Sequence, residues 1–240
     1  MIIAAGDDEV NFDHDAVKIT AGDSCGVLTD GGIKFRMNFY VDEDVVEALE
    51  DADSYRVFAV IANYTTGMNI ASGSGIAVDL VRGDCLGTNG DYYYEYTLLF
   101  GGFTAEDAEK PIGVRGFISY TVDGVEYTVA SEFRSDRDVI IPFEHIYDAY
   151  CNGTYERGTD TNSLRIFLAS NLSVKIKDGK AYDELESDKY ESVYNIEYFD
   201  GVLTISLKGG DIPDWLISCL KINGNERYFE IYEGKIRLVV

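Results

Sequence analysis

The stretch TDGGIKFRMNFYVDEDVVEALED, residues Thr29–Asp51, decides the expected fold class. Apolar and polar side chains alternate over Ile33–Val41, which is the two-residue period of a strand with one buried face. This strand carries Lys34 and Arg36 together on its outward face. The period then changes, and Asp42–Asp51 is expected to form a short acidic helix capped by its first residue.

Hairpin turns are the second recurrent feature of the sequence. Asx-Gly pairs separate alternating segments at four places, and such pairs favour type I′ turns, whose twist matches that of paired strands. The four pairs are Asp123-Gly124, Asp178-Gly179, Asp200-Gly201 and Asn223-Gly224. They predict a mostly β fold of two antiparallel, sandwich-like domains with two or three short helices.

The remaining elements follow from the same patterns. Further strands are expected at Tyr55–Tyr64, Ile76–Val81, Tyr92–Phe100, Leu164–Ala169 and Gly234–Val240. Pro142 suits a first helical position, and the apolar residues after it recur at helical spacing up to Tyr150. Single helical turns are expected after Thr104 and within DIPDWLISCL, residues 211–220.

Charge and composition suggest where the two domains meet. Residues 1–155 carry a net charge of −19 and residues 156–240 a net charge of −4, within a total of −23. The polar segment Cys151–Ser163 lies at this change and is the expected boundary. We predict an acidic sandwich domain over 1–155 and a smaller β domain over 156–240 that serves docking or oligomerisation. The negative field argues against nucleic-acid partners.

Several classes of protein are disfavoured by what the sequence lacks. The opening MIIAAGDDEVNF has no basic region and no long apolar run, so it does not resemble a signal peptide; either one was removed or the protein is not exported through a signal-dependent route. No segment reaches the roughly 18 apolar residues of a membrane span. The four cysteines (Cys25, Cys85, Cys151 and Cys219) form no CxxC pair, so two disulfides and four thiols both remain open.

Three short motifs occur in a recognisable order: GIKFR at Gly32–Arg36, VRGF at Val114–Phe117, and Arg134-Ser135 before a helix. Over about residues 20–150, the chain resembles a recurrent β-rich module of secreted and cell-surface proteins of Gram-positive gut bacteria. The resemblance implies an immunoglobulin-like accessory module on an exposed surface, which a phage of such bacteria could also carry on its virion. It implies no catalytic residue.

Catalytic signals are weak. His14 and His145 are the only histidines, no G-x-S-x-G motif is present, and Gly73 and Gly75 lack the third glycine of a phosphate loop. We therefore expect surface histidines, no catalytic residue and no cofactor. Carboxylate pairs occur at Asp13/Asp15, Asp42/Asp44, Asp51/Asp53 and Asp136/Asp138, but a chain with 43 acidic residues places some pair at glycosidase spacing by chance.

Metal and sugar sites remain open alternatives. Asp7-Asp8-Glu9 could converge with Asp13 and Asp15 on a cation, as could Asp160 with Asn162, although no EF-hand loop is present. Trp215 is expected to pack inside. The run Tyr92–Tyr96 predicts one tyrosine row toward the core and leaves a sugar platform as the less favoured interpretation.

The cations are expected to be structural. We predict that Lys34, Arg36 and a buried Arg115 pair with carboxylates across strands. Together these patterns predict a non-enzymatic structural or adhesive component of a virion or cell envelope. Its partner would be a capsid, tail or envelope protein or further copies of itself, and glycan binding is the alternative.

Overall fold

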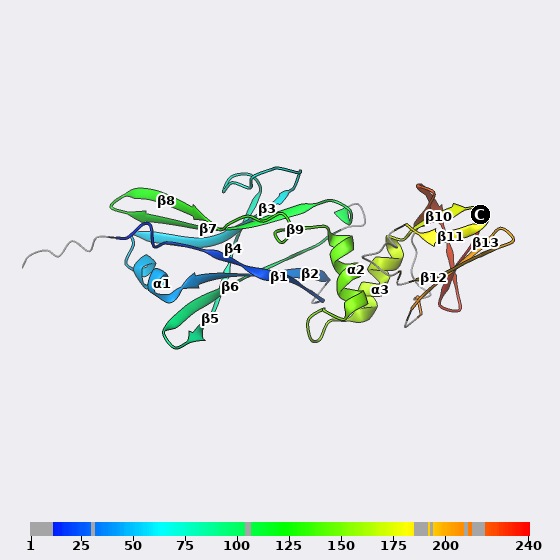
Figure 1. Cartoon of the computed structure of the whole chain (residues 1–240), viewed down its shortest axis with the longest axis horizontal. Coiled ribbons are helices and arrows are strands. Elements are labelled where there is room, and N and C mark those ends of the chain that lie inside the picture. The colour runs from blue at the N-terminus through cyan, green and yellow to red at the C-terminus, as the bar shows by residue number, and fades with distance from the viewer. Residues whose placement is uncertain are drawn as a thin grey trace, which may run out of the picture. The chain divides into compact units, whose positions relative to one another are not determined.

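The computed structural model describes residues 12–29, 32–103, 107–184, 192, 194–208, 211–212 and 219–240. Figure 1 shows strands predominating, as the sequence predicts. The strands form four sheets. In spatial order, sheet A contains β1 (Thr20–Thr29), β2 (Ile33–Asp42), β6 (Asp91–Gly101) and β5 (Val81–Thr88). Sheet B contains β4 (Ile76–Asp79), β3 (Ser54–Asn63), β7 (Ile112–Val122) and β8 (Val125–Ala130), and β9 (Val139–Ile140) also pairs with β7.

The other two sheets come from the C-terminal part of the chain. Sheet C contains β11 (Lys180–Asp183), β10 (Ser173–Lys177), β14 (Cys219–Ile222) and β15 (Asn225–Tyr228). Sheet D contains β12 (Tyr194–Phe199), β13 (Val202–Leu207), β17 (Lys235–Val239) and β16 (Glu230–Tyr232). The helices are α1 (Glu43–Glu50), α2 (Pro142–Asn152) and α3 (Thr161–Ser170).

The chain forms two compact units, each of which is built from three separate segments of the sequence. One unit contains residues 1–24, 37–98 and 113–138, and the other contains residues 25–36, 99–112 and 139–240. The division falls within strands β1, β2, β6 and β7. It measures packing rather than independent folding, so a domain boundary at Cys151–Ser163 stays a prediction.

The core of the first unit lies between sheets A and B. Phe39 on β2 is fully buried, and an added Cβ at Gly116 on β7 would lie 2.5 Å from its ring. A side chain at position 116 would therefore displace Phe39, so the glycine is needed for this close approach. The opposite face of β7 is also covered, because Phe117 stacks on Phe58 and packs with Ile70.

The second unit has its own apolar centre. Phe143 of α2 lies 6.3 Å from Phe167 of α3, measured between ring centroids, and Leu164 and Leu168 of α3 are fully buried. In sheet D, one face buries Leu203, Ile205, Leu207 and Ile236 along with Tyr194. The opposite face of sheet D stays largely open.

All four predicted hairpins are confirmed. Each Asx residue has a positive φ between 48° and 54°, and each following glycine has a φ between 72° and 77°, as a type I′ turn requires. Two further turns of this kind join β5 to β6 at Asn89-Gly90 and β16 to β17 at Glu233-Gly234.

Two local predictions are wrong. Leu164–Ala169 lies in helix α3 rather than in a strand, because the side chain of Asp160 caps the helix by accepting a hydrogen bond from the Asn162 amide. Ile76–Val81 is divided between β4 and β5. The sheets are mostly antiparallel, as predicted, and among the described strand pairs β10 with β14 is parallel.

The predicted helices have the expected bounds within about two residues. Helix α1 buries Val45, Val46 and Leu49. Asp42 occupies its N-cap position, but its side chain makes no cap hydrogen bond, contrary to the expectation. Helix α2 begins with Pro142, as predicted, and ends at Gly153 in the left-handed conformation. The turn expected after Thr104 begins outside the described residues, which exclude 104–106. Most of the turn expected around Trp215 also lies outside them, because 213–218 are excluded.

Candidate functional site

The two histidines occupy structural positions. His14 Nδ1 lies 3.1 Å from Tyr120 Oη, and its ring stacks on Tyr127 with centroids 4.1 Å apart. His145 Nε2 lies 3.2 Å from the carbonyl oxygen of Cys25. Both are half-buried, so the expectation of surface histidines is wrong. Within the described residues, neither ring contacts a serine hydroxyl or a cysteine thiol, as a nucleophilic site would need.

Three of the four carboxylate pairs include a carboxylate held by a local contact, whereas Asp42 and Asp44 line a hollow of about 200 Å³ with Asp91. Asp138 is buried against the Arg137 guanidinium, whereas Asp136 is exposed and paired with Arg134, whose hydrogen bond lowers the pKa of this carboxyl. In another pair, Asp53 Oδ2 accepts a hydrogen bond from the amide of Gly124. These contacts close turns and loops, and none of them places two carboxylates across a cleft.

Neither cation site suggested by the sequence appears among the described residues. Asp160 caps α3, and its hydrogen bonds from Ser163 and Asn162 lower its pKa. Asp7-Asp8-Glu9 lies outside the described range. In the part of the chain that the structure describes, no group of three His, Cys, Asp or Glu side chains converges as metal ligands would.

The tyrosine run forms a gradient of burial rather than a platform. Tyr92 is exposed, Tyr94 lies beneath the Arg82 guanidinium at 3.8 Å, and Tyr96 is buried. On the other side of β6, Tyr93 meets the edge of Tyr40. The row of Tyr92, Tyr94 and Tyr96 therefore reaches the core as predicted, but only Tyr96 is buried. Trp215 lies outside the described residues.

Arg36 on strand β2 holds a loop in place. Arg36 pairs with Glu156 at 3.1 Å, and the Glu156 amide donates to the carbonyl of Val27 on β1. The predicted carboxylate partner is therefore present, but it lies in a loop rather than across a strand. The prediction for Arg115 is wrong, since its guanidinium donates to the side-chain oxygen of Asn69 and to backbone carbonyls instead of bridging carboxylates.

Cys25, Cys85 and Cys151 are thiols. Burial raises the pKa of Cys25 to about 12, with a further contribution from Glu156. The pKa of Cys85 is also raised, by desolvation and by a hydrogen bond to Glu43. Neither of these two thiols is activated for nucleophilic chemistry, which requires a lowered pKa.

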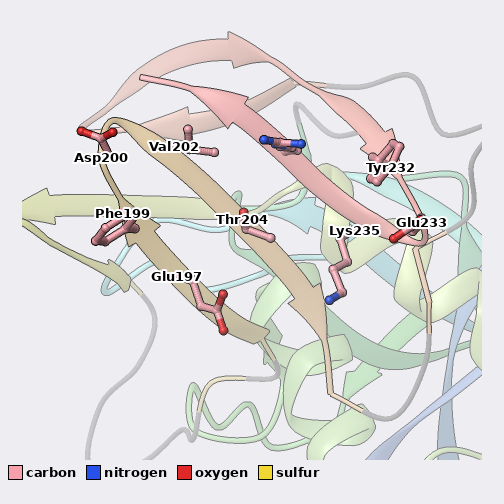
Figure 2. A pocket seen from close by; sticks show the side chains of 9 residues that line it. Glu197, Phe199, Asp200, Val202, Thr204, Tyr232, Glu233 and Lys235 are labelled. Carbon is pink, nitrogen blue, oxygen red and sulfur yellow. The ribbon is translucent and has the colours of Figure 1, made fainter.

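The open face of sheet D is the strongest candidate site. Side chains from all four of its strands surround a hollow of about 480 Å³, within the range of ligand pockets. Figure 2 shows these side chains on one face of the sheet, with Phe199 and Tyr232 on opposite sides of it. The lining residues are Glu197, Phe199, Asp200, Val202, Thr204, Tyr232, Glu233, Lys235 and Arg237.

Strand alternation explains why these side chains share a face. Glu197 and Phe199 are two residues apart on β12, as are Lys235 and Arg237 on β17, so each pair points to the same side. Leu203 and Ile236 occupy alternate positions and fill the buried side. The apolar side anchors the sheet and leaves the polar side accessible.

The face carries exposed aromatic rings and unpaired charges. Phe199 is 84% exposed and Tyr232 is 59% exposed. Glu197, Lys235 and Arg237 make no ion pair with any residue that the structure describes. Exposed aromatics beside unpaired polar groups are typical of a surface that binds a partner.

Sequence reasoning missed this face for an identifiable reason. The strands and the Asp200-Gly201 turn were predicted, but β13 pairs with β17 over a long sequence separation. Nothing in the local pattern shows that Glu197 and Arg237 belong to the same surface. Lys235 and Arg237 repeat the i, i+2 arrangement of Lys34 and Arg36, which is the one available signal.

Two further findings bear on function. Among the described residues, no helix combines the length and apolar character needed to cross a bilayer. No model of a known protein family, no curated protein and no solved structure matches this chain.

Proposed function

We propose that this chain is a non-enzymatic structural or adhesive component of an exposed surface, either a virion or a bacterial cell envelope. The observation that carries the proposal is the open face of sheet D, where the exposed rings of Phe199 and Tyr232 flank charged groups that form no ion pair within the described part of the chain. This face is its adhesive contact. A capsid, tail or envelope protein, or further copies of the chain, holds it in place.

The roles taken by reactive residue types support a binding rather than a catalytic function. His14 and His145 support packed segments, and Asp138 neutralises a buried arginine. The thiol of Cys25 has a pKa raised by burial. These four residues are thus already engaged in holding the fold or carry a suppressed reactivity.

The setting rests on the resemblance of residues 20–150 to surface modules of Gram-positive gut bacteria. A strongly acidic chain suits an exposed position, because its net charge of −23 keeps copies soluble and apart from other acidic surfaces. A carbohydrate-binding accessory module is the second candidate. It is favoured by one observation, the polar floor of the hollow between two exposed aromatic rings.

Adhesion can be tested with the purified full chain. Fluorescently labelled protein is mixed with cells of Gram-positive gut bacteria, and the bound fraction is measured after sedimentation. We expect binding by the wild type and its loss in Phe199→Ser. Ile76→Ser is the matched control, because Ile76 is 72% exposed on β4, a strand of sheet B that takes no part in the sheet D hollow. Equal binding by both variants, or no binding by the wild type, contradicts the proposal.

The non-enzymatic part needs a separate measurement. The same preparation is incubated with bacterial cell-wall and plant polysaccharides, and released reducing ends are quantified. We expect no release above the buffer blank. Sustained turnover that disappears on substitution of a single carboxylate would identify the chain as a hydrolase instead.

A further inference from the structure

A cross-strand row of side chains forms the floor of the sheet D hollow. In the strand register, Glu197 of β12 lies opposite Thr204 of β13, and Thr204 lies opposite Arg237 of β17. The row presents a carboxylate, a hydroxyl and a guanidinium across three strands, and it continues to Glu230 of β16, which lies opposite Arg237. Lys235 lies two residues from Arg237 on the same face and adds a second donor.

Spacing keeps Glu197 and Arg237 from pairing with each other, and Glu230, although opposite Arg237 in the register, makes no ion pair with it. Glu197 and Arg237 are separated by one intervening strand, which places their backbones about 10 Å apart. The acceptor and the donor thus point into the same hollow without neutralising each other, within the residues that the structure describes. A ligand lying across the row can accept a hydrogen bond from Arg237 and donate one to the carboxylate of Glu197.

Aromatic rings bound the hollow at two of its corners. Phe199 lies in the register row of Val202, and Tyr232 lies in the row of Lys235. These rows are about 13 Å apart along the strands. Figure 2 shows the two rings on opposite sides of the face with Thr204 between them. An extended ligand can therefore contact one ring, cross the polar floor and reach the other.

We propose that this hollow binds a neutral sugar chain. The proposal rests on the adhesive function proposed above and names the ligand of that same face. Each sugar hydroxyl both donates and accepts, so one unit can donate to the Glu197 carboxylate and accept from Arg237 or Lys235. The C–H face of a ring packs on Phe199 or Tyr232.

The charges on the face favour a neutral ligand over an acidic one. The hollow is lined by three acids, Glu197, Asp200 and Glu233, against the two cations Lys235 and Arg237. Its net charge is negative, and so is that of the whole chain. An anionic ligand would be repelled at long range, as would a second copy of the protein.

The same charges disfavour a protein partner on this face. The centre of a protein interface is depleted in charged side chains, because burying them without pairing costs free energy. Here Lys235 and Arg237 lie on the inner strand β17, and Glu197 and the two aromatic rings lie on the edge strands β12 and β16. A hydroxyl-rich ligand avoids this penalty, because it satisfies both signs of charge.

The test uses a glycan microarray of neutral and acidic bacterial and plant glycans, probed with the full chain. We expect binding to at least one neutral glycan and to no acidic one. For the bound glycan, Phe199→Ala and Arg237→Gln should each raise Kd about tenfold, the effect of losing one ring contact or one charge-assisted hydrogen bond. Ile76→Ala should leave Kd unchanged. Added NaCl should change Kd little, because the ligand is uncharged.

Each other outcome overturns the inference. Binding confined to acidic glycans with affinity that falls in salt would mean an anion site. Loss of dimers in Phe199→Ala, seen by sedimentation equilibrium, would mean a face between copies. No binding to any glycan, together with cell binding that still depends on Phe199, would refute the sugar ligand and leave the adhesive function standing. Unfolding midpoints of both variants should match the wild type, since Phe199 is 84% exposed.

Discussion

Arg137 and Asp138 are adjacent in the sequence and form a bidentate ion pair with each other. Arg137 Nε lies 2.5 Å from Asp138 Oδ1, and the second nitrogen lies 2.7 Å from Oδ2. The arginine side chain is 11% exposed and the carboxylate 1% exposed. Asp138 also accepts the amide of Arg134, while Arg137 donates to the carbonyl of Ala21. One pair thus closes a turn and ties it to β1.

Asp138→Asn should be strongly destabilising. The substitution leaves the Arg137 guanidinium buried without its counter-charge, and breaking a buried pair from one side costs about 3 kcal/mol or more. Urea unfolding followed by circular dichroism measures this loss. Asp136→Asn is the control, because its pair with Arg134 is exposed and should contribute little. Equal midpoints for the two variants would show that the buried pair is not a stability element.

Two buried tyrosines should respond oppositely to loss of their hydroxyls. Tyr96 Oη has no hydrogen-bond partner in the described structure, whereas Tyr120 Oη lies 3.1 Å from His14 Nδ1. Tyr120→Phe should therefore cost about 1 kcal/mol, and Tyr96→Phe should be neutral or stabilising. Urea midpoints at neutral pH compare the two variants. A larger loss in Tyr96→Phe than in Tyr120→Phe contradicts the assignment.

High pH gives a separate measure of Tyr96. Burial raises its pKa from 10.0 to about 12. Because the unfolded chain ionises first, this tyrosine contributes stability that is present below pH 10 and lost as pH rises toward 12. Tyr96→Phe should lose less stability than the wild type over this interval. Parallel pH curves for the two proteins would mean that Tyr96 ionises normally in the folded state.

Local signals explain how much of the fold was predictable. The Asx-Gly turns were readable because both turn residues have positive φ, which few residue types tolerate. The pair Asn89-Gly90 carries the same signal and could have been used. Asp160 and Ser163 are typical of the start of a helix, and they precede α3. The sequence nevertheless predicts a strand there, because the apolar run that follows also suits a strand. Strand β1 lacks alternation, and its place beside β2 is fixed by tertiary pairing.

The candidate site was less predictable than the fold. Alternation places Glu197 and Phe199 on the outward side of β12, but only the pairing of β13 with β17 brings Arg237 to that surface. Arg115 illustrates the same limit. Its acceptors include the carbonyls of Ser131 and Ile70, and a backbone oxygen leaves no trace in the sequence.

Gly201 should be intolerant of a side chain. It has φ +76° in the turn between β12 and β13, a conformation that strains a β-branched residue. Gly201→Val should lower the free energy of unfolding by more than about 1 kcal/mol. Gly73→Val is the matched control, since an added Cβ there meets nothing within 4 Å and its φ is not in the left-handed region. An unchanged urea midpoint in Gly201→Val would mean that the turn can rearrange.

Glu233 occupies a turn position that asparagine would fill more easily. Its φ is +49°, and it precedes Gly234 in the hairpin between β16 and β17. A non-glycine residue in this region is strained unless it is Asn or Asp, and Glu233 also lines the sheet D hollow. Glu233→Asn should therefore stabilise the protein by a few tenths to about 1 kcal/mol. Thermal and urea unfolding would both report the gain.

The reciprocal substitution separates turn chemistry from function. Asn89 has φ +60° in the same kind of turn between β5 and β6, so Asn89→Glu should lose about as much stability as Glu233→Asn gains. Glycan affinity should fall only in Glu233→Asn, because Glu233 lines the hollow and Asn89 does not. In that case the glutamate at position 233 lowers the stability of the turn and improves binding of the glycan. If Glu233→Asn gains stability and binds the neutral glycan with unchanged Kd, Glu233 contributes nothing to the ligand site and its place in the turn has no functional explanation.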